Sequence, residues 1–289
     1  AVAVEPVGGL LVERGEVVWE PTGRETHLSR FAAAVGRPGW DELLDWSLTD
    51  LDGFWRAVAD HLDVAWRTPP SGGVALADAS MPGARWFPDA ELSYAEHALR
   101  HAAVDPDGVA VIARSQSRPE VTLTWAELSE QVARAAAGLR RWGVGPGDRV
   151  AAYAPNGAET LVLFLAAASV GAAWASCAPE FGVRSVVDRL AQVEPTVLLA
   201  VDGYRYGAKD VDRRAESEAV VAALPSVRHV IPLRHLGPGP DGWSDLLAGP
   251  DPGPPSFAAV PFDHPLYVLF SSGTTGLPKP IVHGHGGIT

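Results

Sequence analysis

Hydrophobic positions from residue 108 onward follow two alternating patterns. Short continuous apolar runs bounded by turn residues are typical of buried strands, and apolar residues three and four positions apart are typical of amphipathic helices. The predicted strands are 109–113, 121–123, 149–154, 172–176, 197–201, 227–233 and 266–270. The predicted helices are 125–142, 158–170, 183–193 and 210–223. Strands that alternate with helices favour an α/β fold with parallel strand pairs and right-handed crossovers.

Helix starts are indicated by a polar residue followed three positions later by an acidic one, the spacing of an N-terminal cap. Four pairs have this spacing: Ser47 and Asp50, Ser93 and Glu96, Thr124 and Glu127, and Asn156 and Glu159. The first pair precedes an apolar face over residues 51–62. Residues 237–256 are rich in Gly, Pro and Asp, which predicts a linker or long loop. We therefore expect a helical N-terminal extension over residues 1–107 and an α/β domain over residues 108–289.

Composition limits the class of partner. With 47% hydrophobic and 20% charged residues, the chain is typical of a globular protein. Its net charge of −12 argues against nucleic acid or an anionic membrane surface as the main partner. Cys177 is the only cysteine, so no internal disulfide can form, which fits a reducing cytoplasm. We expect a cytoplasmic protein, and no oligomeric state follows from the sequence.

One uncharged stretch, residues 160–179, approaches the length of a membrane-spanning helix. It is rich in alanine, contains Gly171 and lacks a basic flank. A buried helix, a turn at Gly171 and a buried strand explain it better than a membrane span. Residues 1–20 carry several charges and no continuous apolar core, so they do not predict a signal peptide.

The most informative stretch follows the strand over residues 266–270. It reads Ser-Ser-Gly-Thr-Thr-Gly-Leu-Pro-Lys-Pro over residues 271–280. Gly273 and Gly276 permit tight turns and close approach of a ligand. The hydroxyls of Ser271, Ser272, Thr274 and Thr275, together with the ammonium of Lys279, supply donors suited to a polyphosphate. The segment therefore predicts a phosphate-binding loop.

The loop is not of the Walker type. That motif places Lys directly after its second Gly and opens a helix. Here Lys279 comes three residues after Gly276 and lies between Pro278 and Pro280, which favour extended backbone. The expected geometry is strand, phosphate loop, strand.

This decapeptide resembles the signature of the adenylate-forming superfamily, which includes acyl-CoA synthetases, luciferases and peptide-synthetase adenylation domains. The alternative is a generic Gly/Ser turn between strands, which the length of the match disfavours. The resemblance implies an adenylate-forming, acyl-CoA synthetase-like N-terminal domain with layered, parallel-rich sheets and helices. Residues 108–289 would then be the first part of the adenylation domain, which ends just after the phosphate loop and before the C-terminal domain.

The resemblance extends along most of the chain. Residues 85–88 and 92–96 are similar to the N-terminal signature of short-chain acyl-CoA synthetases. The acetyl-CoA synthetases tend to carry two glycines where this chain has Pro179 and Glu180 before Phe181. Residues 174–189, 198–207 and 280–287 are instead similar to acetoacetyl-CoA synthetases. Acetoacetate is therefore the expected acid, and acetate, propionate or butyrate is the alternative.

The resemblance implies two half-reactions. A carboxylate attacks the α-phosphate of MgATP to give an acyl-adenylate and pyrophosphate, and the thiol of coenzyme A (CoA) then displaces AMP. Positioning and charge neutralisation dominate such transfers. The implied catalytic residues are Thr275 and Lys279. The implied nucleotide-binding residues are Ser271, Ser272, Gly273, Thr274, Thr275, Gly276 and Lys279.

For CoA, the resemblance implies Arg205 and Lys209, in the region where acetyl-CoA synthetases place two arginines on the nucleotide phosphate. Arg205 matches well, whereas Lys209 matches only with a shift of one residue and a change of residue type. The alternative, surface charges that follow a strand, fits both residues as well.

Two other candidates have simpler interpretations. His283 and His285 could suggest a metal pair, but a structural or pocket-edge role is expected for them and no metal site is predicted. Cys177 has no identified base partner, and a core thiol is the expected role.

Relative to the family, we expect this chain to be an incomplete portion of the enzyme that is inactive by itself. The competing hypothesis is a non-catalytic module that binds phosphate. Ending at Thr289, the sheet would expose a long edge and an apolar face, which favours aggregation over a stable module.

Overall fold

The computed structural model describes residues 25–237, 239, 241–271 and 276–289. The chain divides into two units, Ala1–His61 and Leu62–Thr289. The boundary predicted between residues 107 and 108 falls inside the second unit, so it remains a prediction.

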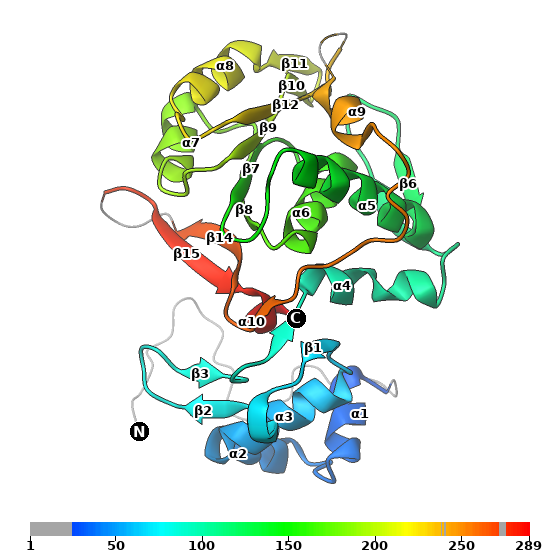
Figure 1. Cartoon of the computed structure of the whole chain (residues 1–289), viewed down its shortest axis with the longest axis vertical. Coiled ribbons are helices and arrows are strands. Elements are labelled where there is room, and N and C mark those ends of the chain that lie inside the picture. The colour runs from blue at the N-terminus through cyan, green and yellow to red at the C-terminus, as the bar shows by residue number, and fades with distance from the viewer. Residues whose placement is uncertain (1–24, 238, 240, 272–275) are drawn as a thin grey trace, which may run out of the picture. The chain divides into compact units, whose positions relative to one another are not determined.

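The described part of the first unit, residues 25–61, contains three helices: α1 (His27–Ala34), α2 (Trp40–Thr49) and α3 (Leu51–His61) (Figure 1). Their apolar faces meet at Phe31, Leu43 and Phe54. The predicted cap at Ser47 is wrong, because Ser47 lies inside α2 and its hydroxyl donates to the Leu44 carbonyl at 2.7 Å. Asp50 takes that role, since its carboxylate accepts the Gly53 N–H at 2.9 Å.

The second unit contains the α/β fold. Its strands are β1 (Trp66–Thr68), β2 (Leu76–Asp78), β3 (Arg85–Trp86), β4 (Glu91–Leu92), β5 (Val109–Ala113), β6 (Val121–Thr124), β7 (Arg149–Tyr153), β8 (Ala173–Cys177), β9 (Val197–Val201), β10 (Gly203–Tyr206), β11 (Lys209–Asp212), β12 (His229–Leu233), β13 (Val260–Pro261), β14 (Pro265–Ser271) and β15 (Lys279–Gly284). Its helices are α4 (Tyr94–Leu99), α5 (Trp125–Arg141), α6 (Ala158–Ser169), α7 (Val183–Leu190), α8 (Arg214–Ala222), α9 (Gly242–Leu247) and α10 (His285–Ile288), with 3₁₀ turns η1 (Ser71–Gly73) and η2 (Arg100–Ala103).

The central sheet has six strands in the order β12-β9-β7-β8-β14-β15. Neighbouring strands from β12 to β14 run parallel, and β15 returns antiparallel to β14. After β7 the chain adds β8 on one side and then β9 and β12 on the other, which is the order of a doubly wound sheet. The predicted α/β class with a parallel-rich sheet is confirmed.

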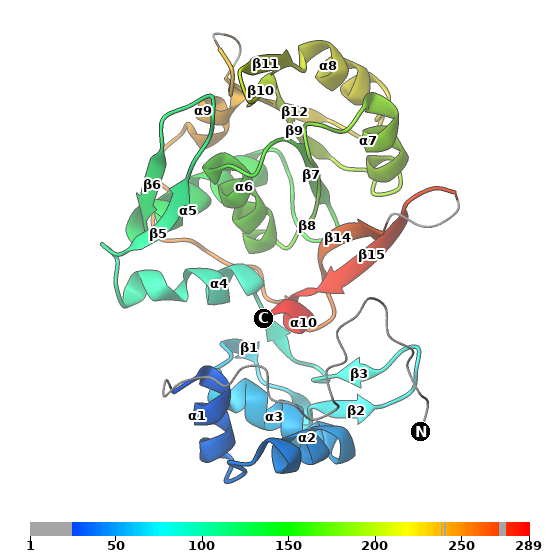
Figure 2. The same cartoon turned by 180° about the vertical axis from the view of Figure 1, so that it is seen from behind.

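Alternate residues of β7 point to opposite faces of this sheet, as the period of a strand requires. Val150 and Ala152 pack with α5 and α6, whereas Ala151 and Tyr153 pack with α7 and α8. The two views in Figures 1 and 2 show these helix pairs on opposite sides of the sheet. The strands are therefore buried on both faces, which explains their continuous apolar runs.

The uncharged stretch over residues 160–179 forms most of α6 and all of β8, joined by a turn in which Gly171 has φ +77°. The predicted helix, turn and strand are therefore confirmed. Within the residues that the structure describes, none of the helices combines the length and the apolar character needed to cross a bilayer.

The helix predicted over residues 210–223 begins later than expected. Strands β10 and β11 form an antiparallel hairpin through Gly207, which has φ +59°, and α8 starts only at Arg214. Residues of an exposed two-stranded hairpin carry no apolar periodicity, so the sequence pattern did not reveal it. Helix α9, inside the stretch predicted as a loop, was also missed, because its six residues are too few to show a helical period.

Two predicted caps are not formed because their acidic partners pair elsewhere. Ser93 precedes α4 without capping it, and Glu96 contacts Arg67 at 2.8 Å. Helix α6 starts after Gly157 rather than Asn156, and Glu159 pairs with an arginine described below. The Thr124 capping box is confirmed, with both reciprocal hydrogen bonds to Glu127.

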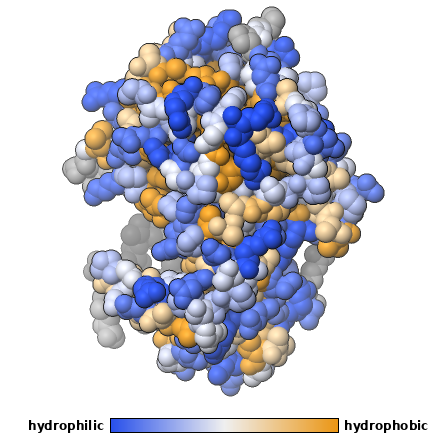
Figure 3. Space-filling model, in the orientation of Figure 1, coloured by the Kyte–Doolittle hydropathy of each residue, from blue (hydrophilic) through white to orange (hydrophobic). Residues whose placement is uncertain are grey.

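Strand β15 is one of the two edge strands of the sheet, and β12 is the other. Ile281 and Val282 on this strand are 45% and 57% exposed. On the face drawn in Figure 3, hydrophobic residues gather in patches between hydrophilic ones. An open edge with hydrophobic side chains is a surface on which another chain can pair.

Candidate functional site

The predicted phosphate loop joins β14 to β15. The two strands form an antiparallel hairpin in which Ser271 pairs with Lys279, so residues 272–278 are the connection. The expected strand, loop and strand are confirmed, and no helix follows the loop directly. Gly276 has φ +94°, the left-handed conformation that favours glycine.

Of the predicted nucleotide-binding residues, three are described. Ser271 and Lys279 lie opposite each other at the two ends of the connection, and Gly276 lies within it. Lys279 is exposed. The other four, Ser272, Gly273, Thr274 and Thr275, lie outside the described residues.

Gln192, which the sequence analysis did not identify, is hydrogen-bonded to the C-terminal end of this loop. The Gln192 amide donates to the Pro278 carbonyl at 2.9 Å and to the Asp188 carbonyl at 2.7 Å. Asp188 belongs to α7, so the bond connects the residue before Lys279 to the end of that helix. Gln192 therefore restrains the backbone from which the Lys279 side chain extends.

A cavity of about 460 Å³ lies beyond the carboxyl ends of β7 and β8. Its lining comes from residues 113–121, 154–160, 176–180 and 204–205, together with His235. Ligands of open α/β sheets bind beyond the carboxyl ends of the strands, where the strand order reverses. The position of the cavity therefore makes it a candidate ligand site.

Arg205 lines this cavity, and Lys209 is not among its lining residues. Arg205 is paired with Asp210 across the β10–β11 hairpin, with Nε 2.5 Å and Nη2 3.1 Å from the carboxylate oxygens. The hydrogen bonds from Arg205 lower the pKa of Asp210, which keeps this carboxylate ionised. An anionic ligand that reaches Arg205 thus competes with Asp210.

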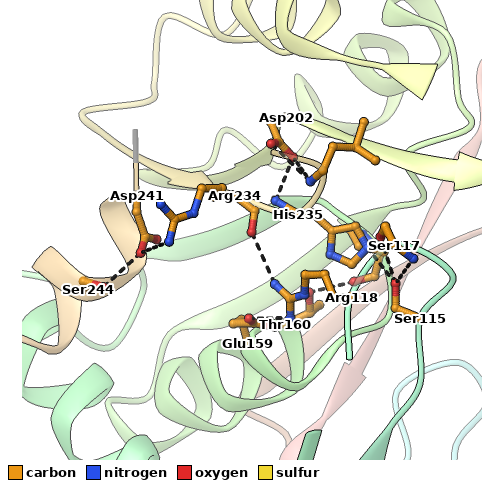
Figure 4. A network of polar contacts seen from close by, with 12 residues as sticks. Ser115, Ser117, Arg118, Glu159, Thr160, Asp202, Arg234, His235, Asp241 and Ser244 are labelled. Atoms are coloured by element: carbon orange, nitrogen blue, oxygen red, sulfur yellow. Dashed lines mark hydrogen bonds and ion pairs between the residues drawn. The ribbon is translucent and has the colours of Figure 1, made fainter. Parts of the chain in front are cut away.

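Further polar groups approach the same cavity (Figure 4). Asp202 follows β9, and its carboxylate accepts the backbone N–H groups of His235, Leu236 and Gly237 at 2.8 to 3.3 Å. The His235 ring thereby reaches Ser115, with Nε2 3.2 Å from the hydroxyl oxygen. Burial lowers the pKa of His235, so its imidazole is neutral at pH 7.

Like Arg114, Arg118 is another cation that lines the cavity. Its Nη2 lies 2.7 Å from the Glu159 carboxylate and its Nη1 donates to the Arg234 carbonyl at 3.3 Å. Both side chains of this ion pair are mostly buried, at 24% and 18% exposure. Figure 4 shows that the pair brings the 115–118 loop against the start of α6.

The sequence analysis missed Arg118, Glu159, Asp202 and His235 as parts of a site. Only Asp202 gave a local signal, since an acidic residue followed by Gly203 at the end of a buried strand is a common position for loop anchors. Arg118 and His235 come from separate loops and Glu159 from the first turn of α6, so the three carry no shared spacing.

The two remaining candidates are buried. His285 accepts the Tyr94 N–H on Nδ1 at 3.1 Å, and no three His, Cys, Asp or Glu side chains gather into a metal-binding group among the described residues. Burial raises the pKa of the Cys177 thiol to about 11, so it stays protonated. Cys177 lies in the hydrophobic core, as expected, and the absence of a metal site stays a prediction.

Comparison with known proteins agrees with this architecture. Residues 99–289 match the model of the AMP-binding enzyme family, and residues 40–98 match that of the acetyl-coenzyme A synthetase N-terminus. The chain is 43% identical to an acetoacetyl-coenzyme A synthetase of Rhizobium meliloti over 86% of its own length and 38% of that protein. It is 35% identical to an acetoacetyl-CoA synthetase of Rattus norvegicus over 94% of its length and 43% of that protein.

A solved acetoacetyl-CoA synthetase from Streptomyces lividans superimposes with a TM-score of 0.85 at 49% sequence identity, covering 91% of this chain and 42% of that one. The chain thus spans less than half the length of the relatives it matches. Since the family model covers about two thirds of the chain, the chain belongs to the AMP-binding enzyme family.

Proposed function

We propose that the protein to which this chain belongs ligates acetoacetate to CoA with ATP, through an acyl-adenylate, and releases AMP and pyrophosphate. The observation that carries the proposal is the similarity to the Streptomyces lividans acetoacetyl-CoA synthetase, which extends over nearly the whole chain at 49% identity. The β14–β15 hairpin supports it, because the loop leads into a strand as the adenylate-forming signature requires.

In this proposal the loop binds the β- and γ-phosphates of MgATP. Lys279 neutralises charge as pyrophosphate leaves, and Thr274, Thr275 and Gly276 donate hydrogen bonds to the phosphates, with Thr275 and Lys279 as the catalytic residues. Ser271, Ser272 and Gly273 shape the turn. The exposure of Lys279 at the start of β15 supports its role, since its ammonium is open to a phosphate. Magnesium enters with ATP as part of the substrate.

The proposed CoA ligand is Arg205, with Lys209 on the neighbouring strand as a weaker contributor. Arg205 lines the cavity at the carboxyl ends of the strands, together with Arg118. Arg114 lines it too, and three guanidinium groups at one cavity suit the phosphates of a nucleotide. Lys209 is exposed and lies opposite Tyr206 on the hairpin. Lys209 would therefore make a peripheral contact.

The remaining expectations follow from this activity. The substrates are small molecules, and the net charge of −12 gives no basic surface for nucleic acid or an anionic membrane. We place the enzyme in the cytoplasm, which the buried free thiol of Cys177 supports.

The test uses the protein encoded by the complete reading frame. Pyrophosphate release is measured with ATP and acetoacetate, acetate, propionate or butyrate. A preference for acetoacetate that is lost in Lys279→Ala and Thr275→Ala supports the proposal. A preference for another acid keeps the mechanism and corrects the substrate. Arg184→Ala, on an exposed side chain of α7, serves as the control variant.

If none of the acids gives pyrophosphate release, the ligase proposal fails. ATP or pyrophosphate binding by the wild-type chain, measured by calorimetry, then separates a non-catalytic phosphate-binding module from a chain with no such site.

A further inference from the structure

Tyr153 supports one wall of the cavity through hydrogen bonds, without lining the cavity itself. It is the last residue of β7 and its side chain is fully buried, at 0% exposure. Its hydroxyl lies 2.8 Å from the Phe181 carbonyl oxygen and 3.1 Å from that of Pro179. One proton is thus shared between two acceptors of the same turn.

That turn follows β8 and forms part of the cavity lining. Cavity-lining residues here include Ala178, Pro179 and Glu180, whereas Tyr153 does not line the cavity. The turn is closed by the Phe181 N–H, which donates to the Ala178 carbonyl at 3.1 Å. The Tyr153 hydroxyl therefore acts on the cavity through the backbone of residues 179–181.

A second contact restrains the same turn from the other side. The Arg189 guanidinium lies 4.9 Å from the centre of the Phe181 ring, and Arg189 donates to the Ser185 carbonyl within α7. With Phe181 held by α7 and the two carbonyls held by Tyr153, the turn has little freedom to move. A fixed wall in the cavity that Arg205 also lines pre-organises this cavity for its ligand.

We propose that Tyr153 is a positioning residue whose hydroxyl fixes turn 179–181 as a wall of the CoA-binding cavity. The identity of the ligand rests on the proposed function above. Because the cavity in that proposal serves the second half-reaction, loss of the hydroxyl affects CoA binding and leaves formation of the acyl-adenylate unchanged.

The test compares the protein from the complete reading frame with Tyr153→Phe, which retains the buried ring and removes only the hydroxyl. A net hydrogen bond is equivalent to a change of about two- to tenfold in an equilibrium constant. We expect the KM for CoA to rise by about that factor, with kcat and acid-dependent pyrophosphate exchange unchanged. Tyr94→Phe, on a half-buried tyrosine outside the cavity lining, is the matched control.

A readout without ligand separates this inference from the proposed function. We expect hydrogen exchange of the Phe181 amide to be faster in Tyr153→Phe, with the amides of β7 and β9 unchanged. If wild-type protein makes no acyl-CoA, the proposed function fails and the exchange rate still decides the role of Tyr153. An unchanged Phe181 amide, or equal effects on the KM for CoA and on pyrophosphate exchange, overturns the inference.

Discussion

The backbone N–H of Tyr94 donates to Nδ1 of His285 at 3.1 Å, across 191 residues of sequence. This bond joins the first turn of α4 to the first residue of α10, the segment that follows the phosphate-loop hairpin. An accepting Nδ1 places the proton of the neutral imidazole on Nε2. His285 is fully buried, and burial together with the neighbouring His264 lowers its pKa to about 4.

Acid should therefore destabilise the fold through His285. Its pKa rises from about 4 in the folded chain to its ordinary value of 6.5 on unfolding, so the unfolded chain binds the proton more tightly. The contribution of neutral His285 to the free energy of unfolding is complete above pH 6.5 and is lost as the pH falls toward 4. This contribution amounts to about 3 kcal/mol.

Urea unfolding of the wild type and His285→Gln, at about pH 7 and about pH 4, measures this contribution. We expect the stability difference between the two proteins to shrink at the lower pH. A difference that does not vary with pH would contradict the assignment.

Substitution of Gly138 by alanine should destabilise the protein, although Gly138 lies inside a helix. An added Cβ would lie 2.3 Å from the Leu246 carbonyl oxygen, where α9 packs on α5. Alanine gains about 1 kcal/mol in helix propensity, but overpacking costs about 1–3 kcal/mol. We expect a net loss of about 1 kcal/mol for Gly138→Ala, measured as the free energy of unfolding in urea.

Gly145→Ala is the matched control, because nothing lies within 4 Å of a Cβ at that position. It should be neutral or slightly stabilising. Equal effects of the two substitutions would show that close packing of α9 does not account for Gly138.

Asp210 should weaken CoA binding, because its ion pair with Arg205 competes with the phosphates of CoA. Asp210→Asn removes the competing charge but keeps a similar shape, so we expect the KM for CoA to fall by about two- to fivefold, the range of an exposed ion pair. Arg205→Ala should raise the KM for CoA, and Lys209→Ala should raise it less.

The effect of Asp210→Asn should also diminish at high salt, because exposed charges are screened. The KM for CoA is measured at low and high ionic strength with saturating ATP and acetoacetate. A rise in KM for Asp210→Asn would mean that Asp210 orients Arg205 rather than competing for it.

Gln192 should support ATP binding through the phosphate loop. Gln192→Leu removes the hydrogen bond to the Pro278 carbonyl, so the backbone before Lys279 gains freedom. We expect the KM for MgATP to rise by about two- to tenfold, with the KM for CoA unchanged.

Arg184→Ala tests whether any change near α7 has the same effect, since the Arg184 side chain is 94% exposed. It should leave both KM values unchanged. If Gln192→Leu behaves like Arg184→Ala, the contact between Gln192 and Pro278 does not position the loop.

The sequence by itself determined the elements whose side chains follow a local period. Strands β7, β8 and β9 are buried on both faces, so their apolar runs are continuous and easily recognised. The turn from β14 into β15 was also predictable, because Gly276 and two prolines constrain the backbone locally.

Only the tertiary structure decided which polar groups meet. Glu159 has the spacing of a cap, yet it pairs with Arg118, 41 residues away. The cavity joins the β5–β6 connection, strand β10 and the loops after β7, β8 and β12. The hydroxyl of Tyr153 reaches a turn that no local pattern connects to it. Such contacts depend on which strands become neighbours in the sheet, and strand order arises from packing over the whole chain rather than from the period of any one segment.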